Sequence, residues 1–256
     1  MNQQSPEKIA RDAKPWGPES APRLPDEGRR RLFRGVGGAG GVLLAVSAKT
    51  ALGGTVCQSP SATMSGNTSP RPGNGTTCSG GLSPGYWVQP QHSLAWPPAG
   101  GVFPTFKTPI SACSTGSLNT VVFTDITNPG TVLQDTFTGW APIGTTLPVS
   151  MWWVMQSPTD PMFGGANGVG QLLRHLSAAW LSAGYYQSST AKYPLTQAQV
   201  VDIWVQLHTT GVYCPQSMQS PGGTCASTAW TASQVISYIS GMYDINAPTT
   251  NYCKGP

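Results

Sequence analysis

The distribution of charged residues and cysteines changes at residue 53, and this change limits what each part of the chain can fold into. Residues 1–53 hold nine Lys and Arg and five acidic residues, whereas residues 54–256 hold five of each sign, together with 22 serines and 26 threonines. All six cysteines lie in the second part. The positive excess therefore belongs to the N-terminal segment, and the body has no basic excess with which to bind a nucleic acid. We expect a neutral body held together by disulfides and apolar packing.

The N-terminal segment has the order of features that is typical of an export signal. Residues 1–28 are polar and contain prolines, so we expect them to be unstructured. A basic stretch follows, and then residues 36–48 are weakly apolar and diluted by glycine. This apolar run is too short to span a bilayer, which takes about 20 residues in a helix. We expect the export machinery as a partner and no stable membrane span.

A resemblance makes the export prediction more specific. The basic stretch resembles the twin-arginine signal pattern of two arginines, any residue, two apolar residues and a basic one. The matching residues are Arg29, Arg30, Leu32, Phe33 and Arg34. A basic surface helix is the weaker interpretation, because glycine is a poor helix former. Small residues at the right spacing precede two alternative cleavage positions, after Ala48 and after Gly53. The chain is expected in the periplasm, at the cell surface or outside the cell.

The cysteines agree with export, because oxidising compartments favour disulfides. They form an even set, which predicts three bridges: Cys57, Cys78, Cys113, Cys214, Cys225 and Cys253. Their pairing is open on sequence alone. The best local pair is Cys214–Cys225, because the segment between them is rich in turn-forming residues. A zinc site is disfavoured, since no two cysteines have metal-ligand spacing.

The body divides by composition into an arm and a domain. Residues 54–83 are rich in Ser, Thr, Gly and Pro, and we expect an irregular or extended arm outside the core. Residues 84–256 are interpreted as one loop-rich helical domain. Within it, the β-branched run at 119–126 predicts a short strand. The runs at 131–138 and 149–156 are too short for periodicity to assign, and short helices are favoured.

The last third has clearer helical signals. Residues 168–186 place apolar side chains on one face, which predicts a buried amphipathic helix after a glycine-rich entry. Thr196 and Gln199 form a Thr-x-x-Gln capping box, and Thr231 and Gln234 repeat it. The fold class expected is mainly α, with long irregular, disulfide-stapled loops and at most a few short strands.

A second resemblance concerns location. Pro84-Gly85-Tyr86-Trp87 followed by Ala95-Trp96-Pro97 resembles a motif of exported bacterial and archaeal surface proteins. Those proteins typically continue with a helix rich in Leu and Ala, and residues 174–183 look like that helix. Val88 and Gln89 depart from the motif, which usually has Lys-Asn there. The resemblance implies an exported surface protein and no particular activity.

Each candidate catalytic motif in the sequence lacks a residue that its chemistry requires. Residues 81–85 read G-x-S-x-G, but Pro84 after the serine lacks the N–H that an oxyanion hole needs. The glycine spacing at 165–170 resembles a phosphate loop, yet Gln171 stands where the lysine should be. The three histidines lack metal-binding spacing. We therefore expect no catalytic residues, no cofactor and no metal.

The aromatic residues are the remaining signal. Most should build the core, but the neighbouring pairs Trp152–Trp153 and Tyr185–Tyr186 cannot both face inward on one helix, so some aromatic side chains are expected on the surface. The candidate binding aromatics are Tyr86, Trp87, Trp96, Trp152, Trp153, Tyr185 and Tyr186. Three hypotheses follow: a surface or matrix structural protein, with self-assembly as one form of it; a glycan-binding module that uses exposed Trp and Tyr; and, as the weakest, an exported hydrolase.

Overall fold

The computed structural model describes residues 58–65, 80–111, 114, 118–187, 192–225 and 228–243. All of them belong to one compact unit, residues 54–256. The export signal at 29–34 lies outside the described residues, as do Cys57, Cys78, Cys113 and Cys253. The predictions made for these residues therefore stay predictions.

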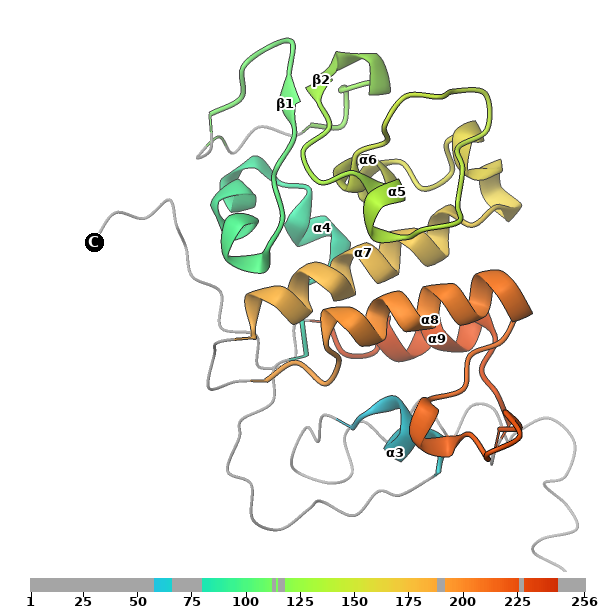
Figure 1. The fold of residues 1–256 in the computed structure, drawn as a ribbon. Helices are drawn as coiled ribbons and strands as arrows, with labels where there is room; N and C mark the ends of the chain where they lie inside the picture. The colour runs from blue at the N-terminus through green and yellow to red at the C-terminus, as the bar shows by residue number, and fades with distance from the viewer. Residues whose placement is uncertain are drawn as a thin grey trace, which may run out of the picture. The chain divides into compact units, whose positions relative to one another are not determined.

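The described chain is mainly helical, as expected from its sequence (Figure 1). The α-helices are α3 (Pro60–Met64), α4 (Pro84–Trp87), α5 (Leu133–Thr136), α6 (Met151–Gln156), α7 (Gly170–Tyr185), α8 (Gln197–Thr210) and α9 (Ala232–Ser240). Short 3₁₀ helices connect them: η1 (Pro90–Ala95), η2 (Pro97–Ala99), η3 (Phe123–Asp125), η4 (Pro161–Phe163), η5 (Gly165–Asn167) and η6 (Gln216–Met218). Two strands, β1 (Thr105–Phe106) and β2 (Ile126–Asn128), form one antiparallel pair. No described helix is long and apolar enough to cross a membrane.

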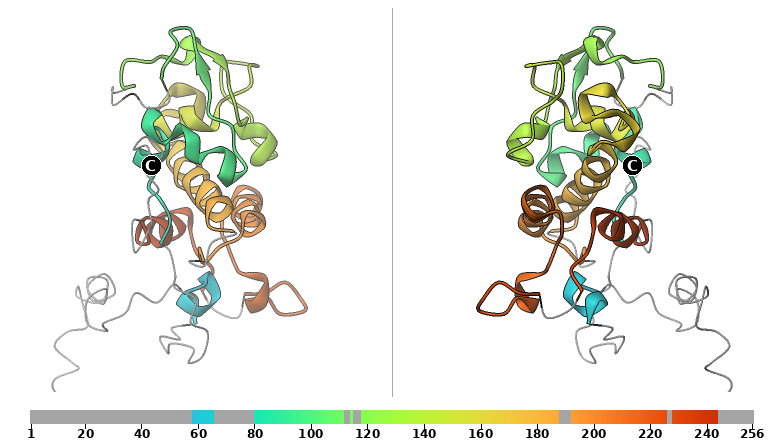
Figure 2. Two further views of the ribbon diagram at one scale, coloured as in Figure 1. Left: turned by 90° about the vertical axis from the view of Figure 1, so that its left-hand side faces the viewer. Right: turned by 90° about the vertical axis from the view of Figure 1, so that its right-hand side faces the viewer.

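Helix α7 is the centre of the described fold. It contacts α4 and α6 together with α8 and α9, and Figure 2 shows α8 and α9 on one side of it and the two strands on the other. Its small residues allow this crowding. A Cβ on Gly184 would lie 2.1 Å from the carbonyl oxygen of Ala99, so η2 can approach α7 only at a glycine. The amphipathic helix expected at 168–186 is thereby confirmed.

The strand predicted at 119–126 is wrong in position. Residues 123–125 form η3, and β2 begins only at Ile126. A carboxylate oxygen of Asp125 accepts a hydrogen bond from the Val122 N–H at 3.1 Å. This local bond folds the β-branched run into a turn, because a short polar side chain competes with ladder hydrogen bonds for the backbone.

Both short helices that the sequence favoured are present, as α5 and α6. The expectation that Trp152 and Trp153 could not both face inward is wrong. Trp152 is fully buried and Trp153 is 5% exposed. Helix α6 is only six residues long and contacts both α4 and α7, so protein covers it on more than one side. Helical periodicity assigns faces only where one side meets water.

The arm expected at 54–83 is partly ordered where it is described. Residues 60–64 form α3, whose N-cap Ser59 accepts a hydrogen bond from Ala62. At its other end Leu82 is fully buried in the core. The Leu82 N–H donates to the hydroxyl of Ser182 on α7 at 2.9 Å. The arm's last residues are therefore part of the core, unlike the expectation of a segment outside it.

The C-terminal helices begin as the capping boxes predicted. The hydroxyl of Thr196 accepts from the Gln199 N–H, and the Gln199 side chain accepts from the Thr196 N–H. Thr231 and Gln234 repeat both bonds at the start of α9. Each helix packs against α7. The two helices are thus fixed by a shared neighbour as well as by the loop between them.

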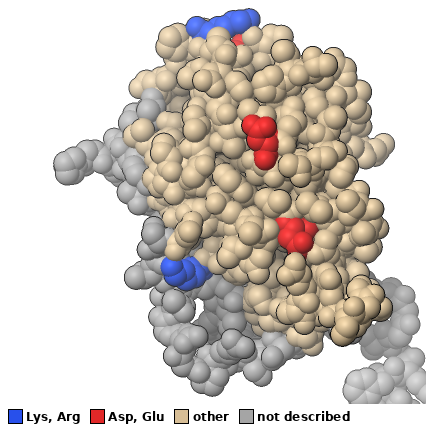
Figure 3. All heavy atoms as spheres, viewed as in Figure 1, with Lys and Arg blue, Asp and Glu red and all other residues tan. Residues whose placement is uncertain are grey.

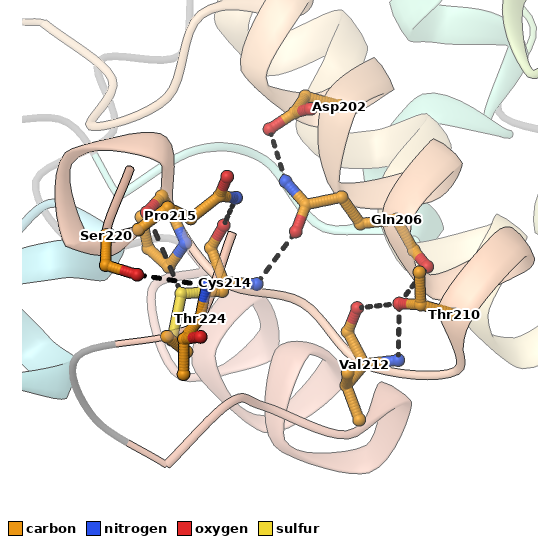
Figure 4. Close-up of a disulfide and its surroundings, with 10 residues drawn as sticks. Asp202, Gln206, Thr210, Val212, Cys214, Pro215, Ser220 and Thr224 are labelled. Atoms are coloured by element: carbon orange, nitrogen blue, oxygen red, sulfur yellow. Dashed lines mark hydrogen bonds between the residues drawn. A yellow bond between two sulfur atoms is a disulfide. The ribbon is translucent and has the colours of Figure 1, made fainter. Parts of the chain in front are cut away.

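That loop carries the predicted Cys214–Cys225 disulfide, with Cα atoms 5.9 Å apart (Figure 4). The backbones of Tyr213 and Trp230 exchange two hydrogen bonds of 2.8 Å just outside it. The side chain of Gln206 on α8 accepts a hydrogen bond from the Cys214 N–H at 2.9 Å. The disulfide therefore closes a loop whose first residues are also hydrogen-bonded to α8.

Candidate functional site

The candidate binding aromatics do not form a surface patch. Trp87, Trp96 and Trp152 are fully buried, and Trp153 and Tyr186 are at most 5% exposed. Tyr86 and Tyr185 are half-buried. None of the aromatic side chains in the described ranges is exposed. The expectation of exposed aromatics is therefore wrong, because a body with few aliphatic residues uses its rings as core.

The motif at 84–97 is instead a packing unit. Ser83 caps α4 by accepting a hydrogen bond from the Tyr86 N–H. The rings of Trp87 and Trp96 meet edge to face, with centroids 6.3 Å apart. The Trp96 indole N–H donates to the Trp87 carbonyl at 3.0 Å. The aromatic positions of this motif have a structural explanation that needs no ligand.

The histidines are distributed over the fold. His92 stacks on Tyr86 and His208 stacks on Trp204. No group of three metal-ligating side chains occurs among the described residues. His175 on α7 is the histidine with the most altered environment. Its Nδ1 lies 2.8 Å from the Tyr243 hydroxyl, and the two rings stack. Burial, and then the neighbouring charge of Arg174, lower the pKa of His175 to about 4.

Beside His175, Arg174 lines a cavity of about 500 Å³ that we call the polar pocket. Its other polar lining comes from three separate segments: Gln89, Gln91, Asn119 and Gln156. Its apolar lining includes Val88, Leu118 and Met155. The surface of the pocket is thus mainly polar, with some apolar side chains beside the polar groups, and convergent polar groups are what fix the orientation of a ligand in a small-molecule site.

Among the residues that the structure describes, Arg174 is the only charged side chain that lines the polar pocket. It is half-buried, and desolvation lowers its pKa. The ion pair found among the described residues joins Lys107 to Asp125 and does not involve Arg174. The guanidinium is therefore partly removed from water and has no carboxylate partner in the described chain, so its donors are available to an anion that enters the pocket.

The sequence did not predict the polar pocket. Its residues come from α4 and η1, from the segment at 118–119, from α6 and from α7. No local spacing links these segments, so only the fold brings them together. Val88 and Gln89, which depart from the surface-protein motif, both line the pocket. Their departure from the motif was the local sequence feature that could have drawn attention to this part of the chain.

Comparison with protein-family models, with curated proteins and with solved structures finds no match to this chain.

Proposed function

We propose that this chain is an exported, disulfide-stabilised structural protein of the cell surface or extracellular matrix, and that it works as a self-associating subunit. The twin-arginine-like segment and the resemblance of residues 84–97 to exported surface proteins support the location. The Cys214–Cys225 disulfide is consistent with an oxidising compartment.

The observation that carries the proposal is the scarcity of charge on the folded body. The described residues include three cationic side chains and four carboxylates: Lys107, Arg174, Lys192, Asp125, Asp135, Asp160 and Asp202. On the face shown in Figure 3 the charged groups are few, and apart from a basic and an acidic group that adjoin at the top they lie apart from one another. Little net charge opposes association of like copies, whereas most monomeric proteins keep themselves apart by charge.

The loop at 141–148 offers apolar contacts for such association. Ile143 is 65% exposed and Leu147 is 58% exposed. The loop is held in place, because the Ile143 N–H donates to the Met162 carbonyl at 2.9 Å and Gln134 donates to the Leu147 carbonyl. Two fixed aliphatic side chains in a region of little charge can be buried by a second copy at low entropic cost.

The glycan-binding alternative loses the feature that motivated it, since the aromatics that were to stack on sugars are buried or half-buried. The hydrolase alternative has no support from the serine of residues 81–85. Ser83 caps α4, and its hydroxyl accepts a backbone hydrogen bond from Tyr86. We therefore keep the structural role as the proposal.

The experiment is sedimentation velocity on the purified mature protein over a range of concentrations, at low and at high salt. We expect the sedimentation coefficient to rise with concentration at both salt levels, because apolar contacts are not screened. The double variant Ile143→Lys/Leu147→Lys should shift the protein toward monomer. Val212→Lys, which alters an exposed valine in the loop after α8, is the matched control and should associate like the wild type. Sedimentation as a monomer at every concentration would contradict the proposal.

A further inference from the structure

We propose that the polar pocket beside Arg174 binds the carboxylate of a small, hydroxyl-bearing organic acid, of which a sugar acid is the type. This inference does not depend on self-association. It starts from a half-buried guanidinium that has no carboxylate partner among the described residues. An anionic group of a ligand would supply that partner.

A single carboxylate suits the charge of the pocket. Of the three cationic side chains in the described ranges, Arg174 lines the pocket, whereas Lys107 and Lys192 do not. A guanidinium offers a planar fork that matches one carboxylate with two parallel hydrogen bonds. Phosphate and sulfate groups carry more oxygen atoms and usually recruit several donors or cations. The pocket is therefore better matched to a monoanionic carboxylate.

The amide side chains around Arg174 suit hydroxyl groups. Gln156 donates from its side-chain nitrogen to the Asn119 side-chain oxygen at 3.3 Å. Gln91 donates in the same way to the Gln89 side-chain oxygen. These pairs leave the amide nitrogen of Gln89 and the amide oxygen of Gln156 without a described protein partner, so both a donor group and an acceptor atom remain for a ligand. A hydroxyl group is complementary to both, since it donates one hydrogen bond and accepts others.

The remaining lining suits a compact carbon skeleton. Met155 is 1% exposed, and Val88 and Leu118 are partly buried. Met155 therefore closes the base of the pocket, while Val88 and Leu118 give it a small apolar surface that part of the C–H face of a ring can contact. The volume of about 500 Å³ lies within the range of about 300–1,000 Å³ that is usual for small-molecule sites. A sugar acid combines a carboxylate, several hydroxyl groups and an apolar face in one molecule of suitable size.

The test is isothermal titration calorimetry of the mature protein with galacturonate, methyl galactoside and sulfate. Galacturonate should bind, while the uncharged sugar and the inorganic anion should bind at least about tenfold more weakly, because a hydrogen bond to a charged group typically contributes that much or more. Equal affinity for methyl galactoside, or tighter binding of sulfate than of galacturonate, would overturn the proposal. Short oligogalacturonates, titrated in parallel, tell whether the acid is recognised free or within a polymer, and either source agrees with the proposed chemistry.

Variants locate the binding in this pocket. Arg174→Gln should lower galacturonate affinity at least about tenfold, and Arg174→Lys should lower it less, because the charge stays while the fork is lost. The control is Lys192→Gln, which removes an exposed cation outside the pocket lining and should leave affinity unchanged. Near-ultraviolet circular dichroism checks that each variant is folded. Should Arg174→Gln not fold, Gln156→Ala and Gln89→Ala carry the test, and unchanged affinity in both would refute the site.

Discussion

The indole N–H of Trp152 donates a hydrogen bond of 2.9 Å to the carbonyl oxygen of Val88, which lies 64 residues earlier in the chain. Trp96 makes the equivalent bond to the neighbouring carbonyl of Trp87. The last carbonyl groups of a helix have no partner within it. Two tryptophans therefore satisfy the end of α4, and the aromatic residues of this region hold the fold together.

Trp152→Phe should destabilise the protein. The substitution keeps an aromatic ring but removes the N–H, so the Val88 carbonyl loses a buried partner, at a cost of about 1–3 kcal/mol in the free energy of unfolding. Chemical denaturation gives this free energy directly. Trp180→Phe is the control, because Trp180 is half-buried on α7 and its indole N–H makes no hydrogen bond in the described chain. Equal losses in the two variants would mean that ring volume, and not the hydrogen bond, matters.

Removing either capping threonine should lower stability. Thr196→Ala and Thr231→Ala each delete the hydroxyl that accepts a hydrogen bond from the first turn of a helix. Such a loss typically costs about 0.5–2 kcal/mol. Thermal melting followed by far-ultraviolet circular dichroism should show both variants melting earlier than the wild type.

Ser233→Ala is the control for Thr231→Ala. Ser233 is exposed in the first turn of α9, and alanine there has the higher helix propensity. This variant should melt at or slightly above the wild-type temperature. If Thr231→Ala melted like Ser233→Ala, the capping box would contribute nothing measurable.

Cys225→Ser should loosen the C-terminal third. A disulfide that closes a loop this short stabilises by about 2–3 kcal/mol in the chain-entropy description. Hydrogen exchange should increase first in the loop at 212–228 and then in α8 and α9, while α6 stays protected. Non-reducing peptide mapping of the wild type should show Cys214 joined to Cys225 and, as predicted from the even number of cysteines, all six oxidised. Free thiols in the purified protein would contradict the prediction that all six cysteines are oxidised.

Acid should weaken the fold through His175. Its pKa in the folded protein is about 4, because burial and then Arg174 disfavour the charged ring, whereas an unfolded chain protonates near 6.5. The unfolded state therefore binds more protons between these values, so this stabilising contribution is complete above about pH 6.5 and is lost as the pH falls toward 4. His175→Gln should reduce the loss of melting temperature over that interval.

Features defined by short spacing were predictable from the sequence. Each of the two capping boxes spans four residues, and Cys214 and Cys225 are separated by 11 positions in the sequence. The strand at 119–126 was misplaced, because the side chain of Asp125 redirects the backbone in a way that β-branched content does not reveal.

Features that need distant segments could not be predicted. The burial of Trp152 and Trp153 follows from the packing of α6 between other helices, and the polar pocket gathers Arg174 with residues from α4, η1 and α6. In both cases the decisive contacts join positions that no periodicity connects.

Export is the central claim, and cell fractionation with an immunoblot against a C-terminally tagged full-length chain tests it most directly. The wild type should appear outside the cytoplasm as a shortened form, because the signal proposed at 29–34 would direct export and would then be removed. The double variant Arg29→Lys/Arg30→Lys keeps the charge but breaks the twin-arginine pattern, and it should remain in the cytoplasm at precursor length. Wild-type protein confined to the cytoplasm would contradict export itself, and normal export of the double variant would contradict the twin-arginine route.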